Sequence, residues 1–171
     1  MATSIRLGPA GWAAVREHLA GSDQERMAYL LARATRWETG GVDLLVTRVI
    51  PVPDQGLSQQ SPAHVVPDPA VTRELLIACY ETGLSLIDVH SHPFATDTVT
   101  FSGRDMANMA ATHRDFLNRM PADPPVGVAS LVVGRRSVAG AATDPATLQL
   151  GPLASLLVIG DQRTEVELCQ P

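Results

Sequence analysis

The pattern of apolar and polar residues along the chain predicts a series of short strands. Apolar runs that are bounded by Gly, Pro or polar clusters are typical of strands. These runs cover Ser4–Leu7, Glu25–Arg36, Val42–Val52, Leu84–Val89, Val126–Val133, Ser137–Ala142, Ala154–Ile159 and Thr164–Leu168. Turns are expected at Thr39-Gly40-Gly41 and about Gly160-Asp161. Segment 53–68 is polar and contains Pro53, Pro62 and Pro67, which predicts a loop or a weak edge strand.

Apolar residues recur at helical spacing in three other segments. The first, Pro9–Ala20, carries a proline at its start and is followed by Gly21. The second, Pro69–Thr82, is followed by Gly83. The third opens at Ser102 and extends to Met120. Together these elements predict one α/β domain over residues 1–171, with a mixed, largely antiparallel sheet flanked by helices.

A His-Ser-His-Pro sequence at residues 90–93 follows the predicted strand Leu84–Val89. Side chains two residues apart on a strand point to the same side, so His90 and His92 can share one ion. Asp105 lies in the first turn of the predicted Ser102 helix. Two imidazoles and one carboxylate leave the fourth position of a tetrahedral zinc site open, which is typical of catalytic zinc.

Each of these residues also has a purely structural interpretation. A His-x-His pair by itself more often marks a polar strand end than a metal site. Ser102 and Asp105 fit a helix N-cap with an acid at the third helical position, close to a capping box. Glu25, which follows Ser22-Asp23-Gln24, fits an ordinary exposed acid.

His90-Ser91-His92-Pro93 and the following Ser102-x-x-Asp105, with Glu25 upstream, resemble the JAMM metalloproteases. These enzymes form the catalytic (MPN+) branch of the MPN domain family. The resemblance implies an MPN-like, cytidine-deaminase-like fold and a zinc ion held by His90, His92, Asp105 and water. It also implies that Glu25 is the general acid and base and that Ser102 donates to the oxyanion.

The chain departs from the family pattern in two places. Twelve residues separate His92 from Asp105, more than is usual in the family, and the surplus falls in segment 94–101. Ala28 and Ala32 stand where glycine is common. A longer surface loop is tolerated by the fold, but this one borders the expected substrate groove, so it bears on substrate choice.

The family's activity implies a compact, prokaryotic-type, zinc-dependent isopeptidase or peptidase. Such an enzyme hydrolyses the bond after the C-terminal tail of a ubiquitin-like protein, in deconjugation or in precursor processing. The implied partners are a ubiquitin-like protein with a glycine-ended tail, its conjugates, and activating and conjugating enzymes; a homodimer is also compatible. Two alternatives stay open: a catalytically silent MPN scaffold, and a small-molecule metallohydrolase.

Composition narrows the class of partner. The net charge is −5 and no basic stretch is longer than Arg135-Arg136, so nucleic-acid binding has no electrostatic basis. No apolar run approaches the roughly 18 residues of a membrane span, and the N-terminus lacks a signal-peptide pattern. The two cysteines, Cys79 and Cys169, do not indicate a secreted disulfide framework. We therefore expect a cytoplasmic protein that binds neither nucleic acid nor membranes.

Overall fold

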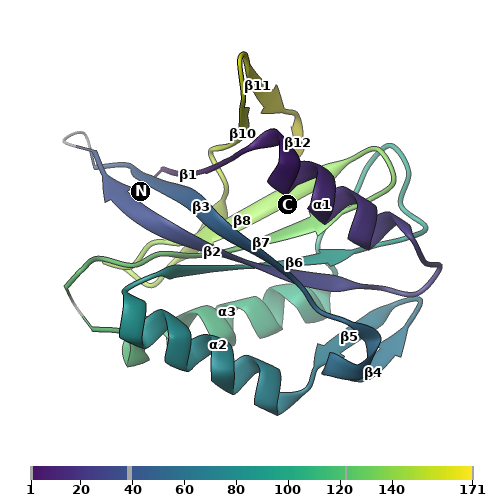
Figure 1. Ribbon diagram of the computed structural model, residues 1–171, viewed down its shortest axis with the longest axis horizontal. Helices are drawn as coiled ribbons and strands as arrows, with labels where there is room; N and C mark the ends of the chain where they lie inside the picture. Colours follow the sequence, from purple (N-terminus) through teal and green to yellow (C-terminus); the bar gives the residue numbers. More distant parts are fainter. Residues whose placement is uncertain (1, 38–39, 122, 171) are drawn as a thin grey trace.

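A 10-stranded mixed sheet forms the centre of the computed structural model, which describes residues 2–37, 40–121 and 123–170 (Figure 1). The strand order across the sheet is β11-β10-β1-β3-β2-β6-β7-β8-β12, and β9 pairs with β8. The strands are β1 (Thr3–Leu7), β2 (Met27–Arg36), β3 (Val42–Pro51), β6 (Ser85–Ser91), β7 (Val128–Val133), β8 (Val138–Thr143), β9 (Leu150–Pro152), β10 (Ser155–Ile159), β11 (Arg163–Val166) and β12 (Leu168–Cys169).

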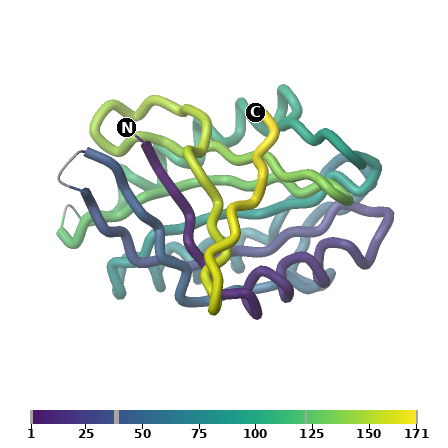
Figure 2. The backbone as a smooth tube through the Cα atoms, turned by 90° about the horizontal axis from the view of Figure 1, so that it is seen from above, coloured from purple at the N-terminus to yellow at the C-terminus, as the bar shows by residue number. Residues whose placement is uncertain are grey.

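The sheet is less antiparallel than the sequence predicts. Strand β1 lies between β3 and β10 and runs parallel to both, which places the N-terminal strand beside the C-terminal hairpin (Figure 2). β6 and β7 are parallel because a helical crossover joins them, and β12 is parallel to β8. The other pairings are antiparallel. The predicted α/β class and mixed sheet are confirmed, whereas "largely antiparallel" overstates the balance.

Helices cover both faces of the sheet. Helix α1 (Pro9–Ala20) lies on one face, and α2 (Pro69–Thr82) and α3 (Gly103–Arg119) lie on the other (Figure 1). Successive residues of β2 alternate between the two cores, because strand side chains have a period of two. Leu30 packs into the core under α1, and Tyr29 and Leu31 pack into the core under α2 and α3. Burial of both sheet faces is the main stabilising contribution to this layered arrangement.

Local chemistry fixes the helix boundaries near the predicted positions. The side chain of Asp68 accepts a hydrogen bond from the Ala70 N–H at 2.7 Å and caps the start of α2. Gly83 ends α2 with φ of 64°, a left-handed conformation that favours glycine. Ser102 caps α3 and Met120 follows its last residue. The predicted bounds of α1 and α2 are confirmed.

Segment 53–68 is more ordered than the sequence predicts. A short 3₁₀ turn (Asp54–Gly56) precedes β4 (Leu57–Ser61) and β5 (His64–Pro67), which form a separate two-stranded sheet, the β4–β5 hairpin. Leu57 and Val65 pack against the core under α2 and α3, and this contact holds the hairpin against the domain. The short strand β9 is additional to the predicted ones, and the predicted strand Thr164–Leu168 is divided between β11 and β12. The hairpin of β10 and β11 agrees with the predicted turn about Gly160-Asp161, whereas Thr39 of the other predicted turn lies outside the described residues.

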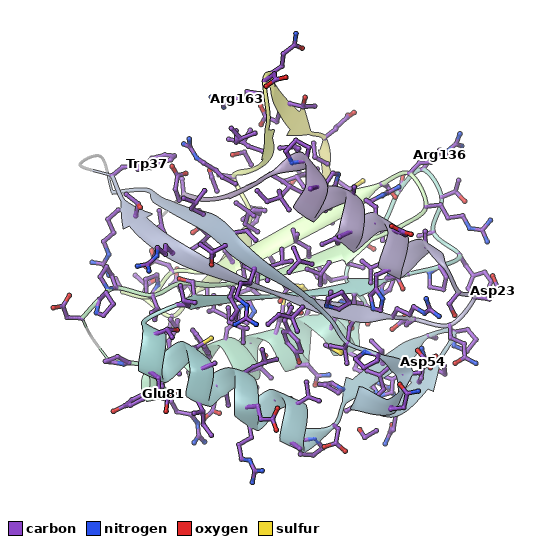
Figure 3. All side chains as sticks on the ribbon, in the orientation of Figure 1. Asp23, Trp37, Asp54, Glu81, Arg136 and Arg163 are labelled. Carbon is purple, nitrogen blue, oxygen red and sulfur yellow. The ribbon has the colours of Figure 1, made fainter. Side chains whose placement is uncertain are left out.

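Several charged side chains extend from the outer surface of the layers. Glu81, Arg136 and Arg163 extend away from the ribbon, Arg163 from the β10–β11 hairpin (Figure 3). Among the described residues, no helix has both the length and the apolar character needed to cross a membrane.

Candidate metal centre

Strand β6 brings two histidines to the face that α2 and α3 cover. Ile87 and Val89 point into the core under α1, so the alternating residues Asp88 and His90 point the other way. His90 pairs with Met27 of β2 and Val132 of β7, which places it inside the sheet rather than at its edge. His92 follows the last residue of β6, and its N–H donates to the Val133 carbonyl at 2.9 Å.

Asp105 approaches both imidazoles from the start of α3. Its Oδ2 lies 3.4 Å from Nε2 of His92 and 3.7 Å from Nε2 of His90. The same oxygen accepts a hydrogen bond from the Ser102 N–H at 2.7 Å, and the Asp105 N–H donates to Ser102 Oγ at 3.1 Å. Ser102 and Asp105 therefore form a capping box, as the structural interpretation predicts, and the box aims the carboxylate at the histidines.

The three side chains fit a divalent metal ion. One ligand atom from each of His90, His92 and Asp105 lies within 4.8 Å of the other two. Ligands about 2.0–2.1 Å from a tetrahedral zinc ion are about 3.3 Å apart, close to the distances from Asp105 to the two imidazoles. Nε2 of His90 is buried and has no hydrogen-bond partner, since 3.7 Å is too long for one. A metal ion would satisfy this nitrogen. The two nitrogens and one oxygen suit several divalent transition metals, so the donor set by itself does not select zinc.

Glu25 lies beside His92 and is not part of β2, which begins at Met27. Its backbone is held by the β4–β5 hairpin instead: the Glu25 N–H donates to the Ser61 carbonyl at 2.9 Å, and Gln60 Nε2 donates to the Glu25 carbonyl at 3.0 Å. The Glu25 side chain is only 6% exposed, and its Oε1 is 3.6 Å from Nε2 of His92. The interpretation of Glu25 as an ordinary exposed acid is wrong.

Burial and neighbouring charges shift the titration of three groups in the site. Burial raises the pKa of Glu25, and the nearby imidazoles offset this only in part. Burial by itself would raise the pKa of Asp105, but His90, His92 and Ser102 hold this pKa well below its usual range. Burial would lower the pKa of His90, yet the carboxylates of Asp105, Asp88 and Glu25 together raise it above its ordinary value of 6.5.

A cavity of about 500 Å³ extends from two of the metal-ligand candidates, His90 and Asp105, between α2, α3, the β4–β5 hairpin and the sheet. Glu25, His90 and Asp105 lie in its wall together with apolar residues such as Met27, Leu76 and Phe116. Asp88 also lines it, a residue that the motif comparison did not single out. The sequence could have indicated Asp88 as a cavity residue, because it lies two residues before His90 on the same strand and therefore points to the same face of β6.

Comparisons with known proteins establish the fold alone. No protein-family model matches the chain, and no curated protein matches its sequence. The chain is similar to the solution structure of protein DSY2949 from Desulfitobacterium hafniense, with a TM-score of 0.53 and 18% sequence identity. This similarity covers 92% of the present chain and 94% of the other chain. At such identity the two proteins share an architecture, and function has to be argued from the site.

Proposed function

We propose that this protein is a zinc-dependent peptidase or isopeptidase of the JAMM type. The observation that supports the proposal is the convergence of His90, His92 and Asp105, with the buried Glu25 carboxylate 3.6 Å from His92. Three protein ligands beside a buried acid are the arrangement of hydrolytic zinc sites, in which the fourth position is left for water or substrate. A catalytically silent scaffold has no need of this set.

The proposed chemistry assigns one role to each residue. Zinc supplies Lewis acidity, which polarises a substrate carbonyl and makes water a nucleophile near neutral pH. Glu25 takes the proton of the attacking water and passes it to the leaving amine. The raised pKa of Glu25 suits both steps. A carboxyl group acts better as both base and acid when its pKa lies closer to the pH at which the enzyme works.

Ser102 is proposed to stabilise the oxyanion of the tetrahedral intermediate. Its Oγ accepts the Asp105 N–H, which leaves the hydroxyl proton of Ser102 to donate elsewhere. The Ser102 side chain is exposed at the start of α3, where a substrate can reach it. One donor of this kind contributes about 10²–10³ in rate in acyl-transfer enzymes.

The proposed substrate is the glycine-ended tail of a ubiquitin-like protein, joined to a target or to its own precursor extension. Extended tails bind by adding a strand to an exposed edge, and the β4–β5 hairpin lies directly beside Glu25. Segment 94–101 follows His92 and carries Phe94, whose side chain is 64% exposed. An exposed aromatic side chain at this place favours a protein substrate over a small molecule.

The test is hydrolysis of a fluorogenic amide of a Gly-Gly-ended ubiquitin-like protein, with zinc content measured on the same samples. We expect Glu25→Gln to keep stoichiometric zinc and lose activity by orders of magnitude, and His90→Ala to lose both. Glu74→Gln, on the exposed face of α2, is the matched control and should behave as wild type. Zinc binding without hydrolysis of any amide would favour the scaffold, and hydrolysis of simple esters alone would favour a small-molecule hydrolase.

A further inference from the structure

A chain of buried polar groups ends on Asp88 in the cavity beside the metal-ligand candidates. Oδ1 of Asp88 accepts a hydrogen bond from the Ser130 hydroxyl at 2.5 Å. Nε2 of His113 is 2.9 Å from the same hydroxyl oxygen, and because the Ser130 proton is directed at Asp88, Nε2 donates to it. Nδ1 of His113 is 2.9 Å from the Thr143 hydroxyl. Three polar side chains, from β8, α3 and β7 in turn, thus form a hydrogen-bonded chain whose last member, Ser130, bonds the Asp88 carboxylate.

This network needs an explanation, because polar groups inside a core are costly unless every one is paired. His113 is 1% exposed, Ser130 is 1% exposed and Thr143 is 3% exposed. An apolar residue at position 113 would fill the same place without that demand. What the network achieves is to hold the Asp88 carboxylate in one orientation, with one oxygen engaged and the side chain still 31% exposed toward the cavity.

The charges around the cavity single out Asp88. A divalent ion would balance Asp105 and Glu25, one negative charge each. Asp115, which also lines the cavity, pairs with Arg119 at 2.8 Å. The chain has no lysine, and no arginine lines the described part of this cavity. Nε2 of His113 is 3.7 Å from Asp88 and donates to Ser130 instead. Asp88 is therefore a fixed carboxylate that no lysine or arginine of the described cavity wall balances, and zinc would keep the neighbouring His90 imidazole neutral.

The walls around Asp88 are largely apolar, so the complementary ligand has an apolar stem and a cationic end. We propose that Asp88 determines substrate specificity by receiving the guanidinium or ammonium group of an arginine or lysine side chain of the substrate. This inference rests on the proposed peptidase function. Asp88 and His90 are two residues apart on one strand, which is about 7 Å, or two residues of an extended peptide. The basic residue therefore lies within about two positions of the scissile bond.

The test is binding of benzamidine to the zinc-loaded protein, in which Asp105 and Glu25 are balanced by the ion, with uncharged benzamide as the comparison. Both molecules are flat and apolar, and only benzamidine carries a cation. Titrations followed by backbone amide shifts in β6 and α3 give the two dissociation constants. We expect benzamidine to bind at least about tenfold more tightly than benzamide, because a charge-assisted pair forms with Asp88.

Variants test whether the preference for benzamidine over benzamide is due to the Asp88 carboxylate. Asp88→Asn should abolish the difference between the two probes, and Asp88→Ser serves the same purpose if the Asn variant does not fold. Ser130→Ala keeps the charge but removes its anchor, and should reduce the preference in part. Asp115→Asn, the matched control, should retain it in full. Equal binding of the two probes by wild type, or a preference that persists in both Asp88 variants, would overturn the inference.

This experiment is independent of catalysis, so the two proposals can fail separately. If the fluorogenic tail is cleaved but benzamidine shows no preference, the peptidase proposal stands and the role of Asp88 is wrong. If benzamidine is preferred but no amide is cleaved, Asp88 is a cation site in a protein of another function, and the link to peptide substrates is lost.

Discussion

Asp105 Oδ2 accepts the backbone N–H of Ser102 at 2.7 Å while it lies 3.4 Å from Nε2 of His92. One carboxylate oxygen thus belongs both to a helix cap and to the candidate metal centre. The start of α3 is fixed by the same atom that faces the histidines. The Ser102–Asp105 pair therefore serves both helix capping and metal ligation. Substitutions at the two positions should affect these two roles differently.

Ser102→Ala should destabilise the fold modestly and impair hydrolysis strongly. Loss of the N-cap oxygen is expected to lower the free energy of unfolding by about 1 kcal/mol. Loss of the donated hydroxyl proton is expected to lower kcat by about 10²-fold or more, while zinc content stays stoichiometric. Chemical denaturation and kinetics of the same samples measure both effects.

Asp68→Ala is the control for the Ser102 variant, because it removes the equivalent cap at the start of α2. It should cost about the same in stability and leave hydrolysis unchanged. Ser102→Thr, which keeps both the cap and the hydroxyl, should keep most of the activity. If Ser102→Ala and Asp68→Ala have the same kcat, Ser102 is a cap and no more.

Asp105→Asn should leave the protein folded and remove zinc. The amide oxygen of asparagine can still accept the Ser102 N–H, so the cap is largely kept. The negative charge between the two imidazoles is lost, and zinc affinity should fall by more than about 100-fold. Competition with a chromogenic chelator measures the affinity. Wild-type affinity in this variant would mean that the ion is held elsewhere.

Helix boundaries could be predicted because they depend on neighbours in sequence. Pro9, Asp68, Gly83 and Ser102 act within one helical turn of themselves, so the bounds of α1 and α2 and the capped start of α3 follow from local chemistry. His90 and His92 were also recognisable, because their spacing matches the strand period. The approach of Asp105 to them follows from residues 92–102, which join the end of β6 directly to the start of α3.

Pairings between distant segments could not be predicted from the same signals. The parallel placement of β1 beside β10 joins the two ends of the chain, and no residue near Ser4 or Ser155 encodes it locally. The short strand β12 forms because its backbone pairs with β8. This pairing is parallel, whereas the sequence predicts only the antiparallel hairpin of β10 and β11 in this part of the chain. Burial of Glu25 likewise depends on the β4–β5 hairpin, which comes more than thirty residues later.

Zinc should reverse the pH dependence of stability. In the zinc-free protein the pKa of His90 is raised above 6.5, so its stabilisation is complete below pH 6.5 and is lost as pH rises through the folded-state pKa. The thermal midpoint should therefore fall between pH 6 and pH 9. Zinc requires neutral imidazoles, so the zinc-loaded protein should instead lose stability toward low pH, as protons displace the metal.

Differential scanning fluorimetry of both forms across this range measures the two slopes. Asp105 acts outside this window: its pKa is lowered, so its contribution is present above its ordinary value of 3.8 and is lost only as pH falls below that. His90→Ala provides the control. Zinc should not raise its thermal midpoint, and the fall in the midpoint between pH 6 and pH 9 that titration of His90 causes should be missing. Parallel slopes with and without zinc would contradict ligation by His90.

The two cysteines should differ sharply in reactivity. Cys79 is fully buried in α2, and burial raises its pKa to about 11, so at pH 8 it is protonated and inaccessible. Cys169 in β12 is only partly buried. A thiol reagent at pH 8 should label one site per chain, and Cys169→Ser should abolish this labelling. Rapid labelling of Cys79 in the native protein would contradict the packing of α2 on the sheet.

The central claim is that His90, His92 and Asp105 hold one zinc ion. Diffraction from zinc-grown crystals, recorded on both sides of the zinc absorption edge, tests it most directly. We predict a single strong anomalous peak about 2.0–2.2 Å from Nε2 of both histidines and from a carboxylate oxygen of Asp105. Full zinc occupancy at another site, with these three side chains unligated, would contradict the account.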